Sequence, residues 1–175
     1  MKSVIGIFLI TVSLVIFGVR ISKKIQFKQN VSGYLKRAAD ASTIEIANEE
    51  LTKVITYLEA NNLTSGYTSM MWETPNEDIG FWYKNLKASQ NELQNLKSES
   101  ALERTNVLIK LRETLLDTGK KTKVTIPKGL AVYPDNKLWG FLITTALFSL
   151  LIGFVLIAIE ADKKAKKKAE EQLKS

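Results

Sequence analysis

The side chains of this chain that could do chemistry are carboxylates, amines and hydroxyls, because it has no cysteine and no histidine. The missing cysteine excludes disulfides, thiol catalysis and thiolate metal sites, and the missing histidine removes the commonest metal ligand. A magnesium or calcium site made of carboxylates would need acidic residues at alternating positions. The pairs Glu77-Asp78 and Asp135-Asn136 are isolated, so we interpret them as helix caps and solvated surface. We expect no metal and no cofactor.

Patterns that carry enzyme chemistry are also missing. The sequence contains no P-loop, no dinucleotide-binding glycine motif, no nucleophile elbow and no zinc-protease motif. A Ser-Lys pair stays open, although no spacing selects one. We therefore expect a protein that is not an enzyme, and the sequence indicates no small-molecule substrate.

The richest group of recognition-type side chains lies in the middle of the chain. Phe81, Trp82 and Tyr83 are consecutive, so on a helix they sweep about 200° of its circumference, whereas a two-helix hairpin buries a stripe little wider than about 100°. At least one ring must then face a third helix, another subunit or water. The alternative is that the group caps the core between two helical arms. Because aromatic and methionine side chains are enriched where proteins meet, we predict a partner-binding surface of Tyr67, Met70, Met71, Trp72, Phe81, Trp82 and Tyr83.

The net charge of +7 is concentrated near the two ends of the chain. Residues 1–24 carry four basic and no acidic side chains, residues 25–137 carry fifteen basic against fourteen acidic ones, and residues 160–175 carry six against four. A nucleic-acid-binding domain would carry its own positive charge, so the near-neutral middle excludes nucleic acid as a partner. We assign a topology or lipid-headgroup role to Arg20, Lys163, Lys164, Lys166, Lys167 and Lys168.

Two uncharged apolar segments flank the middle region. Leu138–Ile159 has 22 residues and would span roughly 33 Å as a helix, which is enough to cross a bilayer core. Val4–Val19 has 16 residues and would span roughly 24 Å, with Lys2 and Arg20 reaching toward the interfaces. A cleaved secretory signal is the competing interpretation of this first segment. It lacks a small-residue cleavage site, so we expect an uncleaved anchor.

Small residues recur every four positions in the second segment. Such spacing lets helices approach closely in lipid. We therefore predict a helix-packing face at Thr145, Ser149 and Gly153.

Orientation depends on where the positive charges lie. Two spans put both termini on one side, and the lysine-rich tail favours the cytoplasm. The middle region has more positive charge close to the spans than the tails have, but loops longer than about 60 residues are translocated largely regardless of charge. We expect an integral membrane protein, in a bacterial inner membrane, with both termini cytoplasmic.

The middle region has helical periodicity. Ile44, Leu51 and Leu58 mark one face of a helix that the capping box Ser42-Thr43-Ile44-Glu45 would begin. Thr74-Pro75 would begin another helix that runs to Thr118, where Gly119 would be a left-handed cap. Breaks at 40–42 and 98–100 leave two arrangements open. The arms form either a tall hairpin with residues 63–74 at its tip, or a four-helix bundle. The segments 123–127 and 130–133 would be extended, as a linker or small β-ribbon.

These features predict a mainly α fold with five parts. Residues 1–20 and 138–160 are transmembrane helices, 21–119 an extracytoplasmic helical hairpin or bundle, 120–137 an extended juxtamembrane linker, and 161–175 a basic cytoplasmic tail. The leading functional hypothesis is a non-enzymatic membrane scaffold or accessory subunit that self-associates or joins a larger membrane complex. The alternative is a membrane sensor or regulatory subunit with the helical domain as its input.

Overall fold

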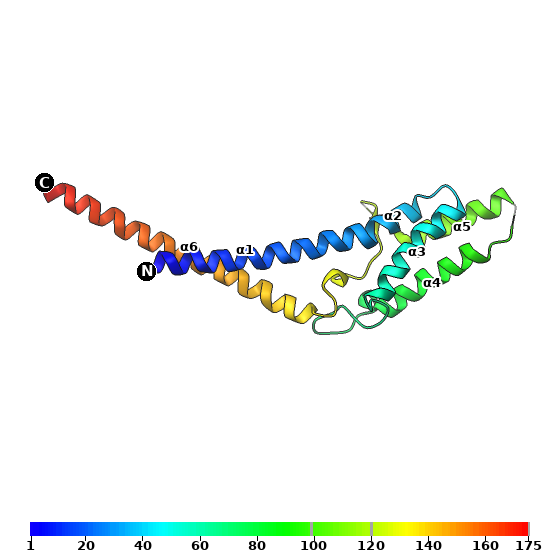
Figure 1. Cartoon of the computed structure of the whole chain (residues 1–175), viewed down its shortest axis with the longest axis horizontal. Helices are drawn as coiled ribbons and strands as arrows, with labels where there is room; N and C mark the ends of the chain where they lie inside the picture. Colours follow the sequence, from blue (N-terminus) through cyan, green and yellow to red (C-terminus); the bar gives the residue numbers. More distant parts are fainter. Residues whose placement is uncertain (99, 120, 175) are drawn as a thin grey trace. The chain divides into compact units, whose positions relative to one another are not determined.

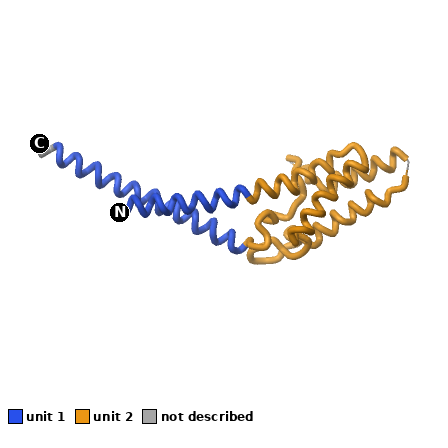
Figure 2. The backbone as a smooth tube through the Cα atoms, viewed as in Figure 1, with its two compact units in different colours: residues 1–22, 137–175 blue, residues 23–136 orange. Residues whose placement is uncertain are grey.

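The computed structural model describes residues 1–98, 100–119 and 121–174 and is mainly helical (Figure 1). The chain divides into two compact units (Figure 2). Unit 1 contains Met1–Ser22 and Lys137–Ser175, and unit 2 contains Lys23–Asn136. The prediction of a mainly helical chain with two long apolar helices is confirmed.

Unit 1 contains most of two long helices. They are α1, Lys2–Phe27, and α6, Asn136–Lys174. Both are long and apolar enough to cross a membrane, and only 11% of the most apolar window of each is buried. Large side chains such as Phe8, Phe141 and Phe148 point outward and are exposed.

The two helices of unit 1 meet through small residues. Ser13 Oγ donates a hydrogen bond to the carbonyl oxygen of Ala146, 2.9 Å away, and both residues are fully buried. Glu160 accepts a hydrogen bond from the backbone N–H of Ser3 and lies 3.6 Å from the terminal amine. At the other end of the pair, the Arg20 guanidinium lies 5.9 Å from the centre of the Trp139 ring.

Unit 2 is built around one hydrophobic core of helices. The helical backbone of α1 continues through a π-helical turn, Lys28–Ser32, into α2, Gly33–Ala39. The chain then folds back into α3, Ile44–Ala60, and, after a loop, forms α4, Ile79–Asn95, and α5, Ala101–Leu115. Helix α2 packs against α3 and α5, and α4 packs against α3 and α5. The buried side chains include Val31, Leu35, Leu51, Leu58, Ile79, Leu86 and Leu115.

The chain folds back at both expected breaks, so the arms are not a single tall hairpin. The first turn occupies residues 40–43, and the second lies between Asn95 and Ala101, where residue 99 is outside the described residues. Helix α3 begins within the predicted capping box 42–45, and its N-cap is Thr43, whose side chain accepts a hydrogen bond from the N–H of Ile46.

The start of α4 differs from its prediction. Thr74 and Pro75 begin a short 3₁₀ turn, Pro75–Glu77, and the α-helix starts only at Ile79. Asp78 is the N-cap, because its Oδ1 accepts from the N–H of Phe81 at 2.9 Å. Two capping residues four positions apart compete, and Asp78, which is adjacent to the buried Ile79, begins the α-helix.

Differences also occur after α5. The helix ends at Leu115, and Gly119 is not a left-handed cap, because the chain becomes extended at Leu116. The strand β1, Leu116–Asp117, pairs antiparallel with β2, Lys123–Val124. The predicted extended segment 130–133 instead contains a 3₁₀ turn, Leu130–Val132, which begins at the left-handed Gly129. The linker prediction starts at residue 120, which lies outside the described residues.

Candidate functional site

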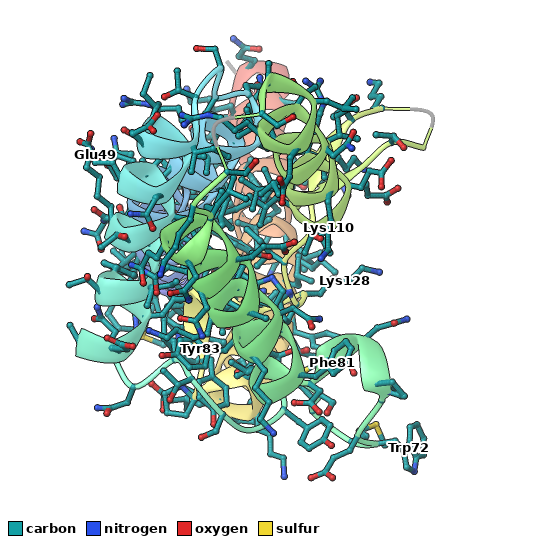
Figure 3. The ribbon with its side chains drawn as sticks, turned by 90° about the vertical axis from the view of Figure 1, so that its right-hand side faces the viewer. Glu49, Trp72, Phe81, Tyr83, Lys110 and Lys128 are labelled. Carbon is teal, nitrogen blue, oxygen red and sulfur yellow. The ribbon has the colours of Figure 1, made fainter. Side chains whose placement is uncertain are left out.

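The three consecutive rings of α4 have three different environments. Phe81 is 63% exposed, whereas Trp82 is only 7% exposed and belongs to the core of unit 2. Tyr83 is half-buried, and its hydroxyl donates a hydrogen bond to Glu59 of α3. Figure 3 shows Phe81 and Tyr83 projecting from opposite sides of α4. Of the three rings that together sweep about 200° of the helix, Phe81 therefore faces solvent, Trp82 faces the core and Tyr83 faces the neighbouring helix α3.

Trp82 joins α4 to the segment that follows β2. Its indole Nε1 donates a hydrogen bond to the carbonyl oxygen of Thr125 at 2.8 Å. The N–H of Thr125 in turn donates to the carbonyl oxygen of Leu115 at 2.9 Å. The backbone of Thr125 is thus held from both sides, and the segment 123–128 lies beside α4.

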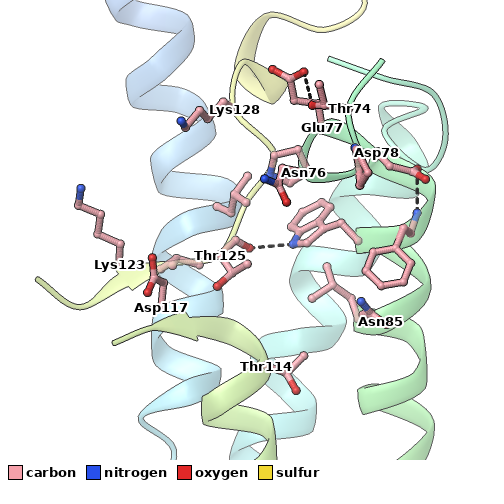
Figure 4. A pocket seen from close by; sticks show the side chains of 17 residues that line it. Thr74, Asn76, Glu77, Asp78, Asn85, Thr114, Asp117, Lys123, Thr125 and Lys128 are labelled. Atoms are coloured by element: carbon pink, nitrogen blue, oxygen red, sulfur yellow. Dashed lines mark hydrogen bonds between the residues drawn. The ribbon is translucent and has the colours of Figure 1, made fainter. Parts of the chain in front are cut away.

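A groove of about 670 Å³ lies between this segment and α4 (Figure 4). Trp82 and Leu86, both buried, form its floor, and the exposed Phe81 stands at its wall. Ile126 and Pro127 provide apolar surface from the opposite side. The polar rim is made of Asn76, Glu77, Asn85, Asp117, Lys123 and Lys128.

The carboxylates at the groove already have structural roles. Asp78 caps α4, Asp117 accepts a hydrogen bond from the N–H of Gly119 at 3.2 Å, and Glu77 accepts one from the Thr74 hydroxyl at 2.7 Å. Among the described residues, no cluster of three or more acidic side chains has the spacing to hold a metal ion. The groove therefore has an apolar centre and a rim that carries both signs of charge.

The other predicted partner-binding residues lie on the loop between α3 and α4, outside the groove lining. Met70, Met71 and Trp72 are exposed, and Trp72 stands clear of the ribbon in Figure 3. Tyr67 pairs with Asp78 in an isolated β-bridge. The negative charge of Asp78 raises the pKa of the Tyr67 hydroxyl, with burial and Glu73 adding to the effect. The structure therefore separates the predicted surface into the Phe81 groove and an exposed loop.

Of the predicted packing residues in α6, only Gly153 is fully buried against α1. A Cβ on Gly153 would lie 2.8 Å from the carbonyl oxygen of Gly6, whereas Ser149 is half-buried and Thr145 is exposed. The contact face instead contains Ala146, with Gly6 and Ser13 opposite. Small residues seven apart, at Gly6 and Ser13 and at Ala146 and Gly153, are the signal that could have identified this face.

The basic tail forms the end of α6. Its lysines at 163, 164 and 166–168 are exposed, and two of them form ion pairs with acidic residues one turn away on the same helix. Lys166 lies 2.9 Å from Asp162, and Lys167 lies 3.8 Å from Glu171.

Sequence reasoning missed the second wall of the groove. The segment 123–128 has no helical periodicity, and its contact with α4 depends on a hydrogen bond between residues 43 positions apart. No local pattern marks such a contact.

Comparison with protein-family models, with curated proteins and with solved structures found no significant match to this chain.

Proposed function

We propose that this protein is a non-enzymatic, membrane-anchored accessory or scaffold subunit that binds a protein partner through the groove of unit 2. The observation that carries the proposal is Phe81: an aromatic ring that is 63% exposed beside a groove floored by the buried Trp82. Large aromatic side chains at the centre of a contact surface contribute most of the binding energy of protein complexes. The partner is a second copy of this chain or a subunit of a larger membrane complex.

The composition of the groove supports a protein as its occupant. Interfaces combine an apolar, desolvated centre with a polar rim that stays near water. Phe81, Ile126 and Pro127 supply such a centre, and Lys123, Lys128 and Asp117 lie around it. The rim carries both signs of charge, which suits a partner surface of mixed charge.

The exposure of α1 and α6 supports the membrane anchor. A core helix of a soluble protein is mostly buried, whereas only 11% of the apolar window of each of these helices is buried. An apolar surface of that extent needs lipid or protein around it. The packing of Gly6 and Ser13 against α6 supports a mature protein that keeps its first helix, rather than a removed signal.

We also propose that both termini are cytoplasmic and unit 2 extracytoplasmic, because the tail of α6 carries five lysines between positions 163 and 168. The chain has no cysteine, so a single introduced cysteine is the only thiol that a reagent can label. In intact cells, a membrane-impermeant thiol reagent should label Asn62→Cys and not Lys168→Cys. Labelling only at position 168 would reverse the orientation and leave both spans in place.

Site-specific photo-crosslinking tests the groove. A benzophenone amino acid at position 81 replaces one exposed aromatic ring by another, and the control carries the same group at Ile46, an exposed residue of α3 outside the groove lining. In native membranes, position 81 should give an adduct of one defined mass, and position 46 should not. Repeating the reaction with the purified chain shows whether the adduct contains a second copy. Equal, diffuse labelling from both positions would contradict the proposal.

A ligand-sensing subunit is the second candidate, and the volume of the groove favours it. About 670 Å³ lies within the roughly 300–1,000 Å³ typical of small-molecule sites. Native mass spectrometry of the protein released from membranes would distinguish the two candidates. A bound small molecule that is lost on Phe81→Ala favours the sensor, whereas a bound protein chain favours the accessory subunit.

A further inference from the structure

The loop between α3 and α4 has a firmly held base and an exposed apolar tip. At the base, the N–H of Thr68 donates to the carbonyl oxygen of Glu77 at 3.0 Å, and the N–H of Ile79 donates to that of Gly66 at 2.9 Å. Beyond this base lie residues 69–76, which we call the Met-Trp loop. Its residues Met71 and Trp72 are 77% and 76% exposed, and Met70 is also exposed. A contiguous group of exposed apolar side chains is typical of a site that contacts protein, ligand or membrane.

Contacts inside unit 2 place the base of this loop beside the segment that leads into α6. Gly66 packs so closely on Tyr133 that a Cβ there would overlap the Tyr133 hydroxyl. A Cβ on Gly129 would lie 3.8 Å from Cβ of Thr68. Tyr133 precedes the apolar segment of α6, which starts at Leu138, by five residues, so at most about 17 Å of chain separates them.

The segment that follows the first apolar helix lies at the same end of unit 2. A small cavity there is lined by Lys23 and Phe27 from α1, by Asn61 and Leu63 from the start of the α3–α4 loop, and by Tyr133. Lys23 comes four residues after Val19, the end of the first uncharged segment. The end of α3 and the loop that follows it therefore lie where both apolar helices join unit 2, and not at a distal tip as the tall hairpin would require.

We infer that the Met-Trp loop is a third membrane contact: Met70, Met71 and Trp72 insert into the headgroup region of the bilayer that α1 and α6 cross. Tryptophan is enriched at this depth because its ring is apolar and its indole N–H can still reach water. The inference rests on the membrane anchoring proposed above.

The charge of the Met-Trp loop and its base indicates which lipid headgroups it can contact. Between Tyr67 and Asp78 there are three acidic residues, Glu73, Glu77 and Asp78, and no basic residue. Attraction to anionic lipid cannot drive this contact. The loop therefore inserts through its apolar side chains and does so equally well in a zwitterionic phosphatidylcholine bilayer.

Depth-resolved fluorescence on the full chain tests the inference. The absence of cysteine allows one NBD fluorophore to be attached at a time, at Met71→Cys, Asn95→Cys or Leu147→Cys. All three native side chains are exposed, so labelling leaves the core intact. Asn95 ends α4, about 24 Å from the start of that helix, and Leu147 lies in the middle of the second apolar segment. Each labelled protein is reconstituted in phosphatidylcholine vesicles containing lipids with nitroxides at a shallow or a deep acyl position.

The expected result is that the fluorophore at position 71 emits at shorter wavelength than the one at position 95 and is quenched more by the shallow nitroxide than by the deep one. Position 147 should be quenched most by the deep nitroxide, and position 95 by neither. An unquenched, water-like signal at 71 together with deep quenching at 147 would overturn the loop contact and leave the anchor standing. A blue-shifted but unquenched signal at 71 would show that protein covers the loop, which also overturns the lipid contact. Loss of quenching at 147 would overturn the membrane anchor itself.

Discussion

Gly6 and Gly153 face each other through their backbones: a Cβ on Gly6 would lie 2.7 Å from the carbonyl oxygen of Gly153, and one on Gly153 would lie 2.8 Å from that of Gly6. A side chain on either residue would push the two helices apart. The hydrogen bond from Ser13 to Ala146, seven residues away on each helix, depends on the same close approach. The pairing of α1 with α6 is thus based on backbone contact.

Replacing Gly6 by alanine should destabilise this helix pair by about 1–3 kcal/mol, because the added methyl group meets a backbone oxygen that cannot turn away. The control is Gly18→Ala in the same helix, where the new Cβ has nothing within 4 Å apart from its chain neighbours and the backbone of its own helix. Thermal unfolding of the detergent-solubilised protein measures both. Equal melting temperatures for the two variants would contradict the close contact.

Truncation of neighbouring rings on α4 should have opposite consequences. Trp82→Ala should cost about 3–5 kcal/mol of stability, because it removes a buried ring from the core and the hydrogen bond to Thr125. Phe81→Ala should change stability by no more than about 0.5 kcal/mol and weaken assembly by about 2 kcal/mol or more if the ring anchors a partner. Melting temperature and oligomer size in detergent separate the two effects. A Phe81→Ala protein that melts early and assembles normally would refute the interface.

Glu50 should matter more for stability than its neighbour Glu49. The Glu50 side chain is almost fully buried and accepts hydrogen bonds from Arg37 at 2.8 Å and Lys53 at 3.0 Å, whereas Glu49 is exposed. Hydrogen bonds to charged groups contribute about 1.5–3 kcal/mol, so Glu50→Ala should cost at least that much. Glu49→Ala removes only an exposed ion pair that solvent screens, so it should cost clearly less. Chemical denaturation of both variants gives the comparison, and similar costs would show that burial adds nothing to the Glu50 contacts.

The Tyr83 hydroxyl should make unit 2 sensitive to alkaline pH. Burial, reinforced by the hydrogen bond to Glu59, raises the pKa of Tyr83 to about 12. An unfolded tyrosine ionises near pH 10, so between about pH 10 and 12 the folded state binds a proton that the unfolded state has lost. The contribution of Tyr83 to stability is complete below about pH 10 and is lost as the pH rises through 12.

Phenolate absorbance tests this assignment. The difference between the titrations of the wild type and Tyr83→Phe should show one group ionising near pH 12. Over the same range, the free energy of unfolding should fall more steeply for the wild type than for Tyr83→Phe. A difference titration centred near pH 10 would place the hydroxyl in water.

Local sequence determined the elements of this protein. The uncharged stretches Val4–Val19 and Leu138–Ile159 indicate long apolar helices. A helix satisfies its backbone hydrogen bonds within the segment, and apolar side chains suit a lipid environment. Thr43 begins α3, and residues 40–43 end α2, because caps and breaks act over three or four residues. Each of these features depends only on neighbours in the chain.

Tertiary structure decided how the elements are used. The sequence shows three rings at 81–83, but only packing against Thr125 and Glu59 determines that Phe81 alone is largely exposed. The base of the Met-Trp loop is adjacent to Tyr133 through Gly66, and no periodicity near residue 70 reveals this contact. Such contacts join residues tens of positions apart, and their free energy depends on the shape of the whole core.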